Sequence, residues 1–215
     1  MNFIFGSASG IGRDLYKIYK NKNLDVYGFD KIDSELTDKV VDLGDIKNID
    51  EIVKIISEHE IDSITYCAGI QDSGNITNLF NVNVLSFIEI IKNTQQKFNK
   101  TIICALSSIH SKASNENNVE YASSKSSLES AIRTFSTSIT NSYYYFLRLG
   151  ATDTNLLREN VKDVKKLKKS LPSGELFESK KIANLIFTIN TEHKELFNGG
   201  HIQIDQGVLS RLSTE

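Results

Sequence analysis

The sequence contains little of several residue types. Its 215 residues include two cysteines, one proline, one methionine and no tryptophan. Cys67 and Cys104 each lie inside an apolar run and form no C-x-x-C pair, which is typical of buried thiols in a reducing compartment. A redox pair made by these two thiols is the alternative. We therefore expect a cytoplasmic protein.

Long apolar runs and an excess of charge of one sign are also lacking. No run approaches the roughly 18 residues of a membrane span, and Met1 and Asn2 lead directly into an apolar segment without a signal-peptide pattern. The formal net charge is −2, and the isoelectric point is about 6.1. These values give no electrostatic reason to expect nucleic acid or a membrane as partner, so we expect a soluble chain that binds a small molecule.

A glycine-rich turn stands near the start of the chain. Residues 3–12 are an apolar run that leads into Gly6, Gly10 and Gly12, and a segment with helical spacing follows. This order predicts a strand, a tight turn and a helix whose first N–H groups suit a pyrophosphate. Glycine lets a phosphate approach closely, and Ser7 and Ser9 add hydroxyl donors. An ordinary strand-to-helix turn is the alternative, so the rest of the chain must decide.

Further predicted strands alternate with helices. Apolar runs predict strands at residues 24–30, 39–43, 61–69, 101–108, 143–149 and 200–205, and helical spacing predicts helices at residues 46–57, 76–98, from 121 onward and 180–190. This alternation predicts an α/β protein, a three-layer doubly wound Rossmann fold with a mostly parallel sheet of about seven strands. With 40% hydrophobic residues and no internal repeat, we expect a single domain over residues 1–215.

Asp30 ends the second predicted strand, 18 positions after Gly12. A carboxylate at this distance from a glycine turn accepts hydrogen bonds from the adenosine ribose and repels a 2′-phosphate. The position therefore favours NAD over NADP. Lys31 beside it keeps NADP possible, and a plain strand-end turn residue is the alternative interpretation of Asp30.

Tyr121 and Lys125 are four residues apart at the start of a predicted helix, so they share one helical face. An adjacent ammonium lowers a phenol pKa from about 10, which would let Tyr121 act as an acid or base near neutral pH. Ser108 ends the preceding strand and can hydrogen-bond a substrate oxygen. Asn83 lies in an apolar helix, where a polar side chain needs a specific partner. An exposed helix pair without function is the alternative for the tyrosine and lysine.

At these residues the chain resembles the short-chain dehydrogenase/reductase family. The family's G-x-x-x-G-x-G pattern stands at residues 6–12, and its Y-x-x-x-K pattern at residues 121–125. Its catalytic serine, 13 positions before the tyrosine, is Ser108, and its helical asparagine is Asn83. The resemblance spans nearly the whole chain. The chain is shorter than is usual for the family, however, and leaves little room for a helix between the second and third predicted strands.

The resemblance implies a role for each matching residue. It assigns catalysis to Asn83, Ser108, Tyr121 and Lys125. It assigns cofactor binding to Gly6, Ser9, Gly10, Ile11, Gly12, Asp30, Asp42, Leu43, Ala68, Gly69, Tyr121, Lys125, Gly150, Thr152 and Thr154, and it implies no metal. Asp42 and Leu43 would lie beside the adenine, and Thr154 would contact the nicotinamide carboxamide.

The segment around residues 152–180 is polar and lysine-rich, and the resemblance implies a mobile substrate lid there. Its lysines 162, 165, 166, 168 and 169 form a solvated helix face, or alternatively attract an anionic substrate. His110 is expected on an exposed loop, with the substrate pocket as the alternative. The helix from residue 76 and the helix after Tyr121 are the surfaces through which the family forms dimers and tetramers, so we expect a homotetramer or homodimer.

The implied activity is an NAD-dependent oxidoreductase that interconverts a secondary alcohol and its ketone. Residues 67–69 and 150–154 look closest to the hydroxysteroid dehydrogenase and carbonyl reductase branch. A non-catalytic dinucleotide sensor that binds protein partners is the alternative, although Ser108, Tyr121 and Lys125 argue against it. An extended sugar-nucleotide epimerase is disfavoured, because too little chain follows Thr154 for a substrate domain.

Overall fold

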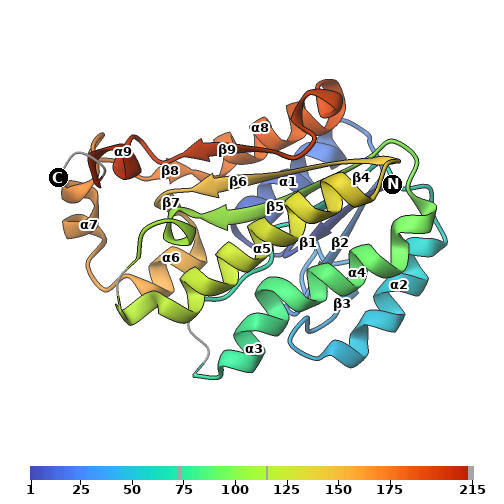
Figure 1. The fold of residues 1–215 in the computed structure, drawn as a ribbon, viewed down its shortest axis with the longest axis horizontal. Coiled ribbons are helices and arrows are strands. Elements are labelled where there is room, and N and C mark those ends of the chain that lie inside the picture. Colours follow the sequence, from blue (N-terminus) through green and yellow to red (C-terminus); the bar gives the residue numbers. More distant parts are fainter. Residues whose placement is uncertain (72–73, 115, 213–215) are drawn as a thin grey trace.

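The computed structural model describes residues 1–71, 74–114 and 116–212, and within these ranges a seven-stranded sheet carries helices on both faces (Figure 1). The strand order is β3-β2-β1-β4-β5-β6-β9, and every neighbouring pair is parallel. The strands are Asn2–Phe5 (β1), Val26–Asp30 (β2), Lys39–Val40 (β3), Ser63–Tyr66 (β4), Thr101–Ser108 (β5), Ser142–Leu149 (β6) and Gly200–Ile204 (β9). The predicted doubly wound α/β fold is thereby confirmed.

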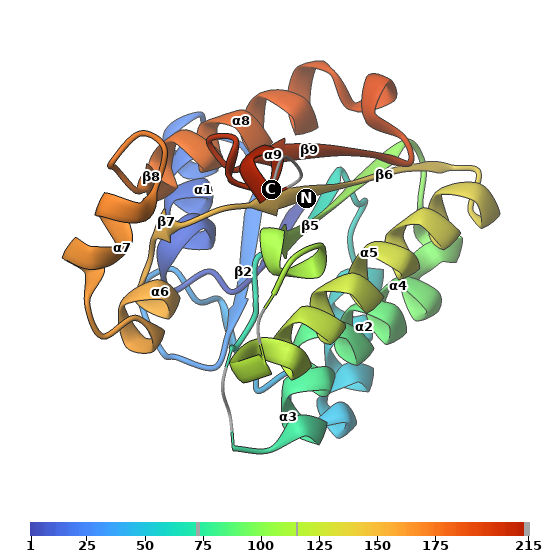
Figure 2. The same ribbon diagram turned by 60° about the vertical axis from the view of Figure 1, so that its left-hand side comes forward.

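Two helical layers enclose the sheet (Figure 2). One layer consists of α1 (Gly10–Asn21) and α8 (Ser179–Glu192), and the other of α2 (Ile49–Ser57), α4 (Ser86–Thr94) and α5 (Val119–Ser138). Successive strand residues point to opposite faces, so each strand supplies both layers. In β1, Phe3 and Phe5 pack under α2, α4 and α5, whereas Ile4 packs under α1 and α8. Burial on both faces explains why the strands read as continuous apolar runs.

The predicted helix over residues 76–98 forms as one helical stretch with a wider turn in its middle. It runs through α3 (Ile76–Phe80), a π-helical turn (Asn81–Leu85), α4 and a short 3-10 turn (Gln95–Lys97). Most of its apolar side chains, such as Phe87 and Ile90, are buried inside this chain. Its hydrophobic circumference is therefore covered largely without a partner subunit.

Several predicted strands are shorter in the structure. β2 begins at Val26, after the exposed Leu24, and β4 ends at Tyr66. Residues 67–69 consequently leave the sheet at its carboxyl edge, where open α/β sheets bind ligands. α5 begins at Val119, one half-turn before Tyr121, so that tyrosine lies within the first turn of its helix.

Residues 31–38 connect β2 to β3 without a helix, as the short spacing predicts. The loop is fixed by Leu36, which packs in the core beside α1, and by Asp38. Asp38 Oδ2 accepts the Gly28 N–H at 2.7 Å and the Tyr16 hydroxyl at 3.0 Å. The loop thus holds the edge of the sheet without a helix.

Both cysteines are free thiols, and burial raises the pKa of each, that of Cys104 to about 12. The interpretation of Cys67 and Cys104 as unpaired thiols is confirmed. Among the helices in the described ranges, none is long and apolar enough to cross a bilayer.

Candidate active site

A cleft of about 650 Å³ opens at the carboxyl ends of the parallel strands. Its walls come from the ends of β1, β2, β4, β5 and β6, from the first turns of α5 and from the segment that follows β6. Every candidate residue except Asn83 lines it: Gly6, Ser9, Gly10, Ile11, Gly12, Asp30, Asp42, Leu43, Ala68, Gly69, Ser108, Tyr121, Lys125, Gly150, Thr152 and Thr154. Residues spread over 149 positions of sequence, from 6 to 154, therefore meet at one place.

The glycine turn is built for close approach. Gly6 and Gly10 have φ values of +85° and +54°, a conformation that favours glycine. A Cβ on Gly12 would lie 2.0 Å from the Gly6 carbonyl oxygen, so that glycine is needed as well. The Arg13 N–H bonds to the Ser9 carbonyl oxygen at 3.1 Å, and residues 10–12 hold the first-turn N–H groups that a helix leaves for other acceptors. The turn therefore fits a pyrophosphate at the start of α1.

Asp30 is fixed at the edge of the cleft. Its Oδ2 accepts the Ala8 N–H of the glycine turn at 2.9 Å, and its Oδ1 accepts the Ile32 N–H at 3.0 Å. These bonds hold the carboxylate beside the turn and leave lone pairs for a further donor. Lys31 lines the same part of the cleft. The geometry suits a carboxylate that accepts hydrogen bonds from a ribose.

Asp42 and Leu43 follow β3 in the sequence and line the same cleft as the glycine turn. Asp42 is exposed, and its Oδ1 accepts the Gly44 N–H at 2.8 Å. Leu43 is buried, and its carbonyl oxygen accepts the Ser86 hydroxyl at 2.6 Å. The pair thus offers one polar and one apolar side chain to a ring system.

Tyr121 and Lys125 are both buried on α5, with 8% and 4% of their surface exposed. The Lys125 ammonium donates to the Leu106 carbonyl oxygen at 2.9 Å and lies 5.7 Å from the centroid of the Tyr121 ring. A Cβ on Gly69 would lie 3.1 Å from Lys125 Nζ, so glycine makes room for the ammonium. The two groups therefore sit together, as their spacing predicts.

The expected low pKa of Tyr121 is not found in the structure. Burial raises the pKa of Tyr121 to about 12, and the neighbouring Ser108 hydroxyl opposes this only in part. Burial also lowers the pKa of Lys125 to about 8. Removing both groups from water disfavours both charged forms, and this outweighs the attraction between ammonium and phenolate. The Tyr121 phenol is therefore in its neutral, protonated form at pH 7.

Ser108 is the last residue of β5, and its hydroxyl oxygen accepts the His110 backbone N–H at 3.2 Å. The hydroxyl lines the cleft and can donate its proton to an oxygen there. Ser108 thus presents the donor that a carbonyl or alkoxide oxygen would need.

Asn83 lies behind the cleft, fully buried in the π-helical turn. Its side chain bonds to both the N–H and the carbonyl oxygen of Ile70 at 2.9 Å, and its Nδ2 also donates to the Ser124 hydroxyl at 2.9 Å. These bonds tie the strand end beside Gly69 to α5. Its part in a proton relay stays a prediction.

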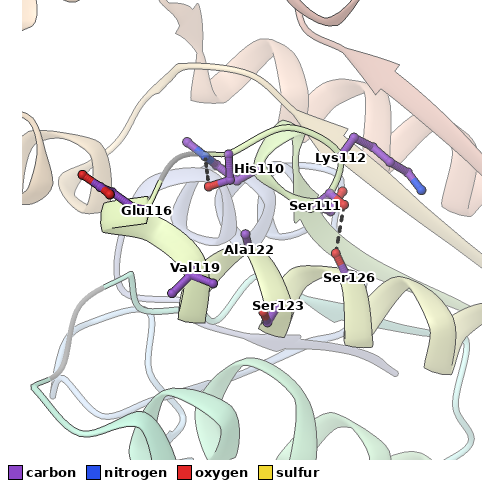
Figure 3. A pocket seen from close by; sticks show the side chains of 9 residues that line it. His110, Ser111, Lys112, Glu116, Val119, Ala122, Ser123 and Ser126 are labelled. Atoms are coloured by element: carbon purple, nitrogen blue, oxygen red, sulfur yellow. Dashed lines mark hydrogen bonds between the residues drawn. The ribbon is translucent and has the colours of Figure 1, made fainter.

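His110 differs from its expected place on an exposed loop. It is half-buried, its ring lies edge-on to the Tyr121 ring at 5.9 Å, and it lines the cleft. Burial lowers the pKa of His110, so the imidazole is neutral at pH 7. His110 also borders a second, more open hollow, in which its segment faces Val119 and Ala122 of α5 (Figure 3). The sequence shows only that this histidine follows Ser108 by two positions, not how its segment folds over Tyr121.

A family model described as enoyl-(acyl carrier protein) reductase matches residues 29–209. The chain belongs to the short-chain dehydrogenase/reductase family. No curated protein sequence matches the chain.

Solved structures share the fold of this short-chain dehydrogenase/reductase. A short chain dehydrogenase family protein from Francisella tularensis subsp. tularensis SCHU S4 has a TM-score of 0.87 and 22% identity over 97% of this chain and 98% of that one. The 3-alpha-hydroxysteroid dehydrogenase from Pseudomonas sp. B-0831, complexed with NADH, has a TM-score of 0.86 and 18% identity over 99% of both chains. A short chain dehydrogenase from Burkholderia cenocepacia J2315, in complex with NADP, has a TM-score of 0.84 and 18% identity over 95% of this chain and 96% of that one. At these identities the likeness shows the fold alone.

A buried ion pair behind Ser108 was missed by the sequence reasoning. Arg148 of β6 donates to both carboxylate oxygens of Glu129 on α5, at 3.0 and 2.8 Å. The hydroxyls of Ser107 and Ser111 donate to the same carboxylate at 2.7 and 2.6 Å. Glu129 follows Lys125 by one helical turn, so the two residues share a face of α5. An acidic residue on the face of this short-chain dehydrogenase/reductase helix that turns toward the sheet was the signal that could have revealed the pair. The pair joins β5, β6 and α5 next to the catalytic candidates.

The segment over residues 152–180 folds as two short helices, α6 (Asn155–Asn160) and α7 (Val164–Ser170), between two paired strands, β7 (Thr152–Asp153) and β8 (Phe177–Glu178). Thr154 caps α6, since its Oγ1 accepts the Leu157 N–H at 3.3 Å. Lys165, Lys166 and Lys169 are exposed, and in the described ranges no lysine of α7 lines the cleft. The interpretation of the lysines as a solvated helix face fits this arrangement.

Proposed function

We propose that this short-chain dehydrogenase/reductase uses NAD to interconvert a secondary alcohol and its ketone, with residues 1–215 as one domain and residues 152–180 as its lid. The observation that carries the proposal is the buried Tyr121 and Lys125 pair, which shares a cleft with Ser108 and with the glycine turn. Two solved structures of the same fold are complexes with NADH or NADP, which supports a nicotinamide dinucleotide. A hydroxysteroid dehydrogenase among them supports the branch suggested by the sequence.

The glycine turn and five side chains in or behind the cleft have proposed parts in the reaction. The glycine turn binds the pyrophosphate through the N–H groups of α1, and Asp30 accepts from the adenosine ribose. The bound dinucleotide supplies or accepts the hydride. Ser108 donates a hydrogen bond to the reacting oxygen, and Tyr121 gives or takes its proton. Lys125 orients the nicotinamide ribose, and Asn83 completes the relay to solvent.

The raised pKa of Tyr121 predicts different pH dependences for the two directions, a level rate for reduction and a rising rate for oxidation. Ketone reduction needs the phenol, which is the form present at neutral pH because burial holds the pKa at about 12. Alcohol oxidation needs the phenolate, so its kcat should rise between about pH 7 and pH 10. Initial rates of both directions across this range test the prediction. An oxidation rate that falls over the same interval would contradict it.

Asp30 should set the preference for NAD. We expect NADH to bind at least about tenfold more tightly than NADPH, a difference of ~1.4 kcal/mol, because Asp30 repels a 2′-phosphate. Asp30→Ala should flatten or reverse this ratio, with Lys31 then free to attract the phosphate. Fluorescence titrations measure both affinities, and Asp33→Ala, in the exposed loop outside the cleft, is the matched control. Equal affinities in the unaltered protein would refute the role of Asp30.

The homotetramer or homodimer stays a proposal with a direct test. Ile76, Leu85 and Val119 keep 57%, 42% and 54% of their surface exposed on neighbouring parts of the long helix and α5. A partner covering these side chains would remove apolar surface from water. Gel filtration with light scattering should give two or four times 24.1 kDa at micromolar concentration. A mass of 24.1 kDa would mean that the protein is a monomer.

A second activity is suggested by the description of the matching family model, which names enoyl thioester reduction. The proposed function is tested by following NADH or NADPH oxidation with a panel of ketones and one unsaturated acyl thioester, and NAD reduction with secondary alcohols. Turnover of a ketone or alcohol supports the proposal. Turnover of the thioester alone favours the enoyl reductase, and dinucleotide binding without any turnover favours the sensor.

A further inference from the structure

The lid contributes four leucines to the lining of the cleft, beside polar side chains such as Asn155 and Ser170. Leu156 and Leu157 of α6 and Leu167 of α7 line the cleft, as does Leu171 just after α7. Each of these four side chains is only partly exposed. The lid therefore turns its leucines toward the cleft, whereas Lys165 and the lysines around it lie on the exposed side of α7.

Three further aliphatic side chains form an apolar wall of the same cleft. Ile70 follows β4, Ile109 follows Ser108, and Val208 begins α9 (Val208–Leu212); all three line the cleft. The hydroxyls of Ser108 and Tyr121 line it as well. A ligand with its oxygen at these hydroxyls would share the cleft with this wall and with the lid leucines.

Charged side chains in the cleft are few and unevenly placed. Among the described residues, those that line it are Asp30, Lys31, Asp42, Lys125 and Glu159. The first three follow β2 and β3, at the dinucleotide end, and Lys125 already donates to a backbone carbonyl oxygen. Glu159, on α6, is the charged group that the lid contributes, and a carboxylate repels anions. In the described ranges the lid offers the cleft no cation that could pair with an anionic substrate.

We propose that the substrate is an uncharged ketone or alcohol whose body is apolar, enclosed between the lid leucines and the Ile70, Ile109 and Val208 wall. The inference rests on the proposed oxidoreductase function and names its substrate class. Apolar surface gains from leaving water, and a charged group without a partner loses its hydration in such a site. A sugar needs partners for several hydroxyls, and the lid leucines and the side chains of Ile70, Ile109 and Val208 offer none.

The test uses matched ketones that differ in one property. We would compare 4-phenylbutan-2-one with its ring carboxylate and with a ketose, measuring kcat/KM with saturating NADH. The apolar ketone should be preferred over each of the others by at least about tenfold. Leu167→Lys should reduce or invert the preference over the carboxylate, since it places a cation on the cleft wall. Lys166→Gln, on the exposed face of the same helix, should leave it unchanged.

A binding measurement separates failure of this inference from failure of the proposed function. The melting temperature of the protein with NADH should rise with the apolar ketone or its alcohol, and not with the carboxylate or the ketose. Such a rise without any turnover would support the apolar site while rejecting the oxidoreductase. Preference for the carboxylate, lost when Lys165, Lys166 and Lys169 are changed to Gln, would overturn the inference. Preference for the ketose, or no stabilisation by any compound, would overturn it as well.

Discussion

The Tyr121→Phe variant is expected to lose about 10²–10⁴-fold in kcat, which is the usual contribution of a positioned acid or base. The substitution removes a buried hydroxyl that lies next to Ser108 and on the same helical face as Lys125. The aromatic ring stays in place and keeps its edge-on packing with His110. NADH should therefore bind with similar affinity, and the loss should fall on kcat. Steady-state rates and an NADH titration of the same preparation measure the two effects separately.

A matched tyrosine serves as control. Tyr143 lies on β6, packs on the side of the sheet that faces α1 and α8, and is outside the cleft lining. Tyr143→Phe removes a hydroxyl of the same kind and should change kcat less than about twofold. A Tyr121→Phe protein that keeps more than about a tenth of the activity would remove Tyr121 from the chemistry.

The Glu129→Ala variant is expected to lower the free energy of unfolding by about 3–5 kcal/mol. It leaves the Arg148 guanidinium, which is only 5% exposed, without its buried carboxylate. The hydroxyls of Ser107 and Ser111 lose the same acceptor. Urea denaturation at pH 7 measures the change. Arg133→Ala, which removes the exposed partner 3.6 Å from Glu129, is the control and should cost no more than about 1 kcal/mol.

The same carboxylate gives this stabilisation a pH dependence. Burial alone would raise the pKa of Glu129, but the bonds from Arg148, Ser111 and Ser107 hold it below its ordinary value. The pair therefore stabilises the fold fully above the pKa of an unfolded glutamate and is lost as pH falls through the lower, folded value. A Glu129→Ala protein as stable as the unaltered one at pH 7 would contradict this account.

The arrangement of the cleft was predictable from local patterns. The strand, the three glycines and the helix start at residues 3–12 are adjacent in the sequence, so their turn can be predicted from local patterns. Tyr121 and Lys125 share a face because a helix repeats every 3.6 residues. Asp30 could be placed because parallel strands end at one edge of the sheet. Each of these inferences needs only the geometry of one element or of adjacent strands.

Other features depend on segments that are far apart in the sequence. The pKa of Tyr121 is raised because distant residues exclude water from it, and no spacing on one helix records that burial. Arg148 meets Glu129 because β6 lies under α5, and His110 covers Tyr121 because its loop turns back over the helix. The apolar residues around Asn83 cover much of a helix circumference, so their periodicity does not reveal the wider π-helical turn there.

The most direct test of the central claim is a fluorescence titration of the purified protein with NADH. The account predicts saturable binding of one NADH per chain, with the glycine turn and Asp30 as its contacts. Absence of NADH and NADPH binding by a protein that circular dichroism shows to be folded would contradict the account, since the oxidoreductase needs the dinucleotide.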